Sequence, residues 1–301
     1  MTRRGWLLFA AMCVIWGIPY LLIRVAVREL APETLVFART SIAALLLLPV
    51  AVARGELLPV LRRPLPLLVF AAVEIALPWV LLSHAETDVS SSLAGLLIAA
   101  VPLVATVIAR TTGDRERLGL TSTLGLLVGL VGVGAIVGLD VGGTSGPALA
   151  ELGLVAVGYA VGPILLARYL NGLPALGVIA LSLGLSALVY APVSAFRMPS
   201  ELPAGRVLAS VAALAVVCTA IAFLLFFALI AEIGPVRATV ITYVNPAVAA
   251  LLGVTILDES FTVGMGVGFV LVLLGSVLAT RPGGARSAEP EPLLIASETG
   301  P

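Results

Sequence analysis

The sequence predicts an all-α membrane protein with ten transmembrane helices, arranged as two inverted repeats of five helices. Composition, the spacing of apolar runs and an internal repeat lead to this prediction. Apolar residues make up 60% of the 301 residues and charged residues only 11%, whereas a soluble domain carries about 25% charge. Water is therefore not the main solvent of this chain.

Ten apolar runs follow one another along the chain. Each holds about 20 residues, the length that an α-helix needs to cross a hydrocarbon core of about 30 Å. The first run begins after Arg3 and Arg4, and the others lie at 33–53, 66–85, 89–110, 118–138, 149–170, 174–195, 206–230, 235–256 and 261–280. Because the connections are short, consecutive helices should lie antiparallel and adjacent in a compact bundle.

Arginine placement predicts the orientation of these helices. Twelve arginines fall on the side of the amino terminus and four on the other side, with Arg39 inside a helix. Arginine is retained on the cytoplasmic side, so we expect both termini in the cytoplasm and a multi-pass protein of the cytoplasmic membrane. The start of the chain also weakly resembles a twin-arginine signal, with Arg3 and Arg4 before Leu7 and Leu8. The tail 283–301 is rich in Pro, Glu and Ser and is predicted to be disordered.

A hairpin of two apolar runs occurs twice, at 90–138 and 238–279. Aligning the copies superposes Pro102 on Pro246 and Glu116 on Glu259. The repeat extends beyond the hairpin, with Pro19 aligned on Pro163 and Arg24 on Arg168. We therefore divide the chain into a first repeat, 1–140, and a second, 147–282. Five spans is an odd number, so the second repeat would enter the membrane upside down, which is a common basis for alternating access.

Glycines are frequent in the last helix of each predicted repeat. They would let the two helices pack closely, although glycine is common in membrane helices in any case. These glycines are Gly125, Gly129, Gly132 and Gly134 in one helix and Gly264, Gly266, Gly268 and Gly275 in the other.

The charged and reactive residues exclude several classes of function. The net charge is zero, which argues against a nucleic-acid partner. All 17 basic residues are arginine, so a Walker A lysine and a Schiff base are ruled out. His84 is the only histidine, which excludes His-rich metal sites, and Cys13 and Cys218 are isolated in apolar runs. We expect no metal, no cofactor and no catalytic residue.

Glu74 is the most informative charged residue. It lies about eight residues into the third run, about 12 Å from the cytoplasmic face at 1.5 Å per residue. An ionised carboxylate there costs roughly 3 kcal/mol, so the side chain should face the bundle interior. Glu74 is either a proton-coupling or cation-binding group, or a structural hydrogen-bonding group. Arg39 is its candidate partner; the alternatives are that Arg39 extends toward the membrane surface or binds backbone carbonyls.

Several uncharged side chains are candidates for substrate contact. Tyr243 and Asn245 precede a proline, Pro246, near the middle of the ninth run. Carbonyls freed by proline at this depth persist only if they are packed or line a cavity. Trp16, Trp79 and Tyr159, together with Tyr20, could form an aromatic wall for an organic or cationic substrate. Packing, or an aromatic belt at the membrane surface, would explain the same residues. Helix kinks for gating or packing are expected at four prolines: Pro19, Pro102, Pro163 and Pro246.

The motifs together resemble the EamA repeat of the drug/metabolite transporter superfamily, whose ten-helix members contain two copies. The resemblance covers residues 5–282 and rests on Trp16-Gly17, on Arg39 before a small-residue helix, on Pro-centred spans that end in Glu116 and Asp258-Glu259, and on the stretches 226–234 and 243–246. The first hinge departs from the family pattern, with Asp114-Arg115-Glu116-Arg117 in place of one Glu followed by Arg. Leu181 stands where the second repeat would need a counterpart of Arg39, so no role for a symmetric arginine pair is expected.

The resemblance implies a secondary transporter that moves a small organic metabolite, such as an amino acid or drug-like solute, often outward, through a central cavity. Glu74 would couple transport to protons. The rival interpretations are a lipid-modifying intramembrane enzyme and a channel or scaffold. The expected partners are a small-molecule substrate and the lipid bilayer, and a homodimer is left open.

Overall fold

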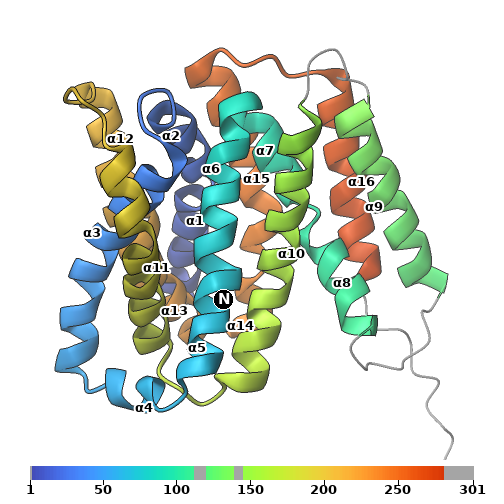
Figure 1. Cartoon of the computed structure of the whole chain (residues 1–301). Helices are drawn as coiled ribbons and strands as arrows, with labels where there is room; N and C mark the ends of the chain where they lie inside the picture. The colour runs from blue at the N-terminus through green and yellow to red at the C-terminus, as the bar shows by residue number, and fades with distance from the viewer. Residues whose placement is uncertain (1, 112–119, 139–144, 281–301) are drawn as a thin grey trace, which may run out of the picture.

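The computed structural model describes residues 2–111, 120–138 and 145–280, and in these ranges the chain forms helices packed side by side (Figure 1). Their bounds are α1 Arg3–Ile15, α2 Ile18–Ala26, α3 Pro32–Ala53, α4 Leu57–Leu61, α5 Pro64–Phe70, η1 Ala71–Ala76, α6 Leu77–Asp88, α7 Ser91–Ile98, α8 Val101–Thr111, α9 Leu120–Gly138, α10 Gly146–Tyr169, α11 Ala175–Arg197, α12 Gly205–Ala215, η2 Val216–Ile221, α13 Ala222–Ile233, α14 Pro235–Ala238, α15 Ile241–Leu257 and α16 Val263–Ala279.

Eight helical stretches in the described ranges are long and apolar enough to cross a membrane. Two further apolar helices, α15 and α16, are shorter, with 17 residues each. Turns at Thr239 and Val240 separate α14 from α15 and shorten the ninth predicted run. The hinge around Glu116 and the tail 283–301 lie outside the described residues.

Two short π-helical segments, η1 and η2, interrupt otherwise α-helical stretches. A π segment leaves backbone carbonyls without their usual helical partners. At η1, the Tyr190 hydroxyl from α11 donates to the Ala76 carbonyl at 3.0 Å. At η2, the Thr219 hydroxyl donates to the Leu214 carbonyl at 2.8 Å. Side chains thus stabilise both interruptions.

The four prolines expected to kink helices fall into two groups. Pro19 follows the interruption at Trp16 and Gly17 that separates α1 from α2, and Pro102 follows the interruption that separates α7 from α8. Proline suits the first turn of the new helix because it has no N–H to leave unpaired. Pro163 and Pro246 lie inside the uninterrupted helices α10 and α15.

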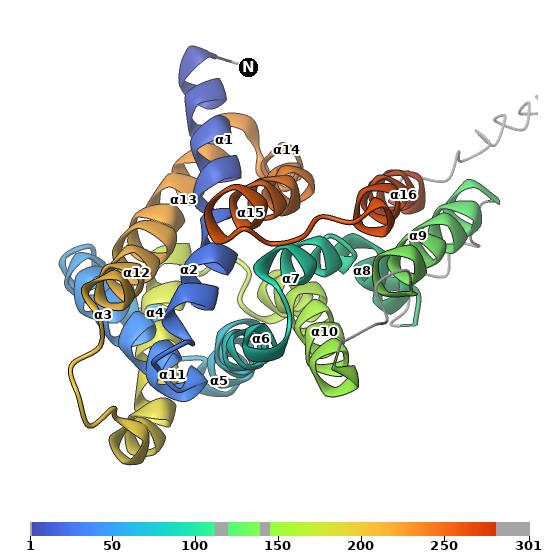
Figure 2. The same cartoon turned by 90° about the horizontal axis from the view of Figure 1, so that it is seen from above.

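Helices far apart in sequence pack in corresponding pairs. The pairs α3 with α11, α7 with α15 and α9 with α16 each join a helix of the first half to one of the second half. Likewise η1 packs against α11 and η2 packs against α3. Seen from above, α9 and α16 lie side by side at the edge of the bundle (Figure 2).

Glycines form the contact between α9 and α16. A Cβ built on Gly132 would lie 2.7 Å from the backbone N of Val272, and one on Gly268 would lie 2.6 Å from the Gly132 carbonyl oxygen. Gly125 and Gly275 face equally close backbone atoms. Gly134, by contrast, has nothing within 4 Å of its Cβ position. The glycine pattern of the sequence therefore marks a real helix contact at some of its positions.

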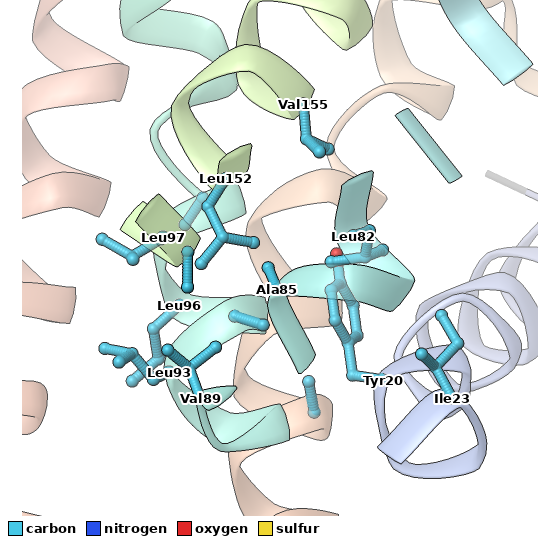
Figure 3. Packing of buried hydrophobic residues seen from close by; sticks show 14 of the residues in the cluster. Tyr20, Ile23, Leu82, Ala85, Val89, Leu93, Leu96, Leu97, Leu152 and Val155 are labelled. Carbon is cyan, nitrogen blue, oxygen red and sulfur yellow. The ribbon is translucent and has the colours of Figure 1, made fainter. Parts of the chain in front are cut away.

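The largest cluster of buried apolar side chains joins α2, α6, α7 and α10 (Figure 3). In this view the ring of Tyr20 extends from α2 toward Leu82 of α6. A second cluster, around α3, α5, α6 and α11, includes Trp79. Tyr159 packs against both clusters, so the two clusters meet at this side chain.

Candidate functional site

Arg39 lies inside the bundle, with only 7% of its surface exposed. Its Nε donates to the Thr219 hydroxyl of η2 at 2.9 Å, and its guanidinium lies 3.6 Å from the centre of the Trp79 ring. No ion pair joins Arg39 to an acid in the described ranges. Arg39 neither reaches the membrane surface nor pairs with Glu74 here, so it is a buried cation held by a hydroxyl and an aromatic face.

Glu74 lies in η1 and faces α10, where a side chain on Gly162 would collide with its carboxylate. The absence of a Cβ at Gly162 therefore makes room for the acid. Its Oε2 atom is buried and has no hydrogen-bond partner. A buried polar atom without a partner costs about 1–3 kcal/mol, so it calls for a further ligand or proton.

Tyr159 of α10 connects the two charged residues. Its hydroxyl is close enough to interact electrostatically with both Glu74 and Arg39, and its side chain contacts Trp79. Tyr20 of α2 interacts in the same way with Tyr159 and Arg39. The structure thus brings together five of the predicted site residues: Arg39, Glu74, Trp79, Tyr159 and Tyr20.

Trp16 belongs to a different aromatic group. Its ring packs 4.7 Å from Phe226 and 5.8 Å from Phe223, measured between ring centres, and Phe223 stacks on Phe227. Among the described residues, the ring contacts of Trp16 are with these phenylalanines and not with Trp79 or Tyr159. The three phenylalanines follow η2 on α13, and no pattern in the sequence predicts that they meet Trp16.

Asn245 and Tyr243 of α15 have different surroundings. With its amide oriented to satisfy its neighbours, the Asn245 side chain donates to the carbonyls of Cys13 at 2.9 Å and Ile241 at 3.0 Å. The Cys13 carbonyl lies just before the interruption between α1 and α2. Asn245 therefore stabilises this interruption, while Tyr243 is only partly buried.

Replacing Asn245 by alanine is expected to lower the thermal stability of the protein. The Cys13 carbonyl would lose its donor, and interhelical hydrogen bonds in membrane proteins contribute about 0.6 kcal/mol on average, up to about 1.7 kcal/mol. Thermal unfolding of the purified protein in detergent measures this. Tyr243→Phe is the matched control on the same helix and should unfold like the wild type; equal unfolding of all three proteins would contradict the role assigned to Asn245.

The described residues hold no group of three His, Cys, Asp or Glu side chains that could bind a metal ion. The site consists of one acid, one arginine, aromatic rings and hydroxyls. Such groups can bind and orient a small molecule, and the acid and the hydroxyls can exchange protons.

Both halves of the chain are similar to a known protein family. The model of the EamA-like transporter family matches residues 3–138 and again 149–281. The chain belongs to the EamA-like transporter family. Membership in this family points to a multi-pass membrane transporter rather than an enzyme, and the two matches give the EamA-like chain a two-repeat architecture.

A curated relative agrees with this assignment, and a solved structure shares the fold. The uncharacterized inner membrane transporter YedA of Escherichia coli K12 is 30% identical over 281 residues, which cover 89% of this EamA-like chain and 90% of YedA. YedA of E. coli O157:H7 matches to the same extent. A crystal structure at 23% identity, with a TM-score of 0.66, covers 93% of this chain and 98% of its own, which shows a shared fold.

Proposed function

We propose that this protein is a secondary transporter of the cytoplasmic membrane that exports a small zwitterionic metabolite, such as an amino acid, in exchange for protons. The observation that carries the proposal is a pair of opposite charges near Tyr159, Arg39 and Glu74, neither of which has an ion-pair partner among the described residues. Arg39 is buried, and Oε2 of Glu74 is buried without a hydrogen-bond partner. A substrate carboxylate would pair with Arg39 and a substrate ammonium with Glu74. Each of these ion pairs would offset the cost of burying the protein's charge without a counter-charge.

Competition between a proton and the substrate ammonium for Glu74 would couple substrate transport to proton transport. The carboxylate binds either a proton or the substrate ammonium, because both need the same oxygen atoms. Protonation therefore releases the substrate, and substrate binding releases the proton. An inward proton gradient would drive substrate outward through this exchange.

The wider architecture that we propose is ten membrane helices in two inverted five-helix repeats, 1–140 and 147–282, with both termini in the cytoplasm. The pairing of α3 with α11, of α7 with α15 and of α9 with α16 supports it, because each pair joins helices of the same rank in the two halves. The two π segments support it further, since each lies in the third long helical stretch of its half. Alternating access would then exchange the conformations of the two halves.

Counterflow of labelled amino acids in proteoliposomes tests the function. Flux that saturates, and that speeds up when unlabelled substrate is present on the opposite side, belongs to a carrier. A channel would conduct without this acceleration, and a lipid-modifying enzyme would show no flux. Analogues in which a neutral group replaces either the carboxylate or the ammonium should fail to exchange.

Replacing Glu74 by glutamine is expected to remove the pH dependence of substrate binding. In the wild type, affinity should weaken as the pH falls, because protons compete for the carboxylate. The amide of the variant cannot titrate, so its weaker affinity should be the same at every pH. Binding measured across a pH series decides this, with exposed Glu201→Gln as the control; a Glu74→Gln variant with the full pH dependence would remove Glu74 from the mechanism.

A further inference from the structure

Glu86 is a second buried carboxylate, close to one end of the bundle. It lies at the end of α6, twelve residues after Glu74 and so about 18 Å further along the same helical stretch at 1.5 Å per residue. Its side chain is 0% exposed, and both carboxylate oxygens are buried without a hydrogen-bond partner. An ionised carboxylate buried in this way is strongly disfavoured, whereas a protonated one avoids most of the cost.

The connection between α15 and α16 runs along the upper end of the molecule in Figure 1, and its Glu259 contacts the start of α7. The Glu259 carboxylate in this connection accepts hydrogen bonds from the backbone N–H groups of Ser91 at 2.8 Å and Ser92 at 2.9 Å. Both serine hydroxyls donate to it as well. Glu259 thus caps α7 with charge-assisted bonds and joins the two family matches; we call this contact the Glu259 latch.

Charged or titratable groups approach Glu86 from α2, from α10 and from the connection between α15 and α16. From α2, Arg24 donates to the main-chain carbonyls of Glu86 and Thr87, and the Tyr20 hydroxyl interacts electrostatically with the Glu86 side chain. From α10 comes Tyr159, and from the latch comes Glu259. His84 and Glu151 pair with each other at 2.8 Å between Nδ1 and Oε1, in a half-exposed contact. Arg24 donates its hydrogen bonds to the backbone and acts on the Glu86 carboxyl only electrostatically, so this carboxyl has no hydrogen-bond partner.

We propose that Glu86 is a second proton-binding site, which loads from the upper side when the Glu259 latch opens and passes its proton to Glu74. This inference rests on the proposed proton-coupled transport and adds the outer half of the proton path. The transfer breaks the O–H bond of the Glu86 carboxyl and forms an O–H bond at Glu74, with no other net change. Tyr159 interacts electrostatically with both acids, and Tyr20 interacts with Glu86 and with Tyr159. Each hydroxyl can donate one proton and accept another, so the two tyrosines can relay a proton.

Glu86→Gln separates this role from a structural one, since the amide keeps the size and loses only the titration. In proteoliposomes the variant should keep counterflow and the pH-dependent substrate affinity that Glu74 confers. It should lose the accumulation of substrate that a proton gradient drives in the wild type. Asp88→Asn, an exposed carboxylate at the same end of α6, is the control and should accumulate substrate normally. Gradient-driven accumulation by Glu86→Gln at the wild-type level would overturn the proposal.

A second measurement needs no substrate. Raising the pH of the purified protein in detergent should release more protons from the wild type than from Glu86→Gln, as followed with a pH-indicator dye. The Glu259→Gln variant, with a weakened latch, should release the Glu86 proton faster. Equal proton release by the wild type and Glu86→Gln would overturn the role of Glu86, whether or not a substrate has been found. Absence of counterflow in the wild type would instead defeat the proposed transport function.

Discussion

Replacing Arg39 by glutamine is expected to weaken substrate binding by at least about 100-fold. The substrate carboxylate would enter a buried site without its counter-charge, and leaving one partner of a buried pair alone costs about 3–5 kcal/mol, where 1.4 kcal/mol corresponds to a tenfold change. Glutamine can still donate to Thr219, so the packing of α3 against η2 is kept. Binding of labelled substrate to the purified variant measures the loss.

The stability of the same variant separates function from folding. Arg39 is an unpaired buried cation in the absence of substrate, so its removal should leave thermal unfolding unchanged or raise the unfolding temperature. Arg28→Gln changes an exposed arginine in the turn after α2. This control should alter neither substrate binding nor thermal unfolding. Wild-type affinity in Arg39→Gln would contradict the assignment of Arg39 to the substrate carboxylate.

Replacing Gly275 by alanine is expected to destabilise the protein by about 1–3 kcal/mol, the usual range for overpacking. A Cβ on Gly275 would lie 2.5 Å from the Gly129 Cα and 2.7 Å from the Gly125 carbonyl oxygen. Backbone atoms cannot move aside as a flexible side chain can, so α9 and α16 would have to separate. Thermal unfolding in detergent measures the effect.

Gly134→Ala is the matched control for this prediction. Its Cβ position is open, and alanine in a helix is favoured over glycine by roughly 0.5–1 kcal/mol, so this variant should be at least as stable as the wild type. Equal losses in Gly275→Ala and Gly134→Ala would show that the α9 and α16 contact has no special dependence on its glycines.

The sequence predicted the helices because apolar runs and short polar connections are local signals. It predicted kinks at four prolines, and helix interruptions lie just before two of them, Pro19 and Pro102, where the missing N–H makes proline a start signal for the next helix. It did not predict η1 or η2. A π segment is one extra residue within an apolar helix, and it leaves the hydropathy of the run unchanged.

The candidate site was predicted in part. The sequence predicts that Arg39 and Glu74 face the bundle interior, because a charge exposed to lipid at membrane depth is costly. Their partners do not follow, since Thr219 and Gly162 are 180 and 88 positions away along the chain and carry no charge signal. Asn245 was expected to contact substrate, and its bond to the Cys13 carbonyl became visible only when α1 and α15 were placed together. Burial of Glu86 likewise became visible only with α6 packed against its neighbours.

The two π segments also carry historical information. Each holds six residues, and each falls in the third long helical stretch of its own family match, 3–138 or 149–281. An ancestral repeat with one inserted residue in its third helix would account for both segments at once, because each copy of that repeat would carry the same insertion. The fourth residue differs between the two segments: it is an acid, Glu74, in η1 and a hydroxyl residue, Thr219, in η2.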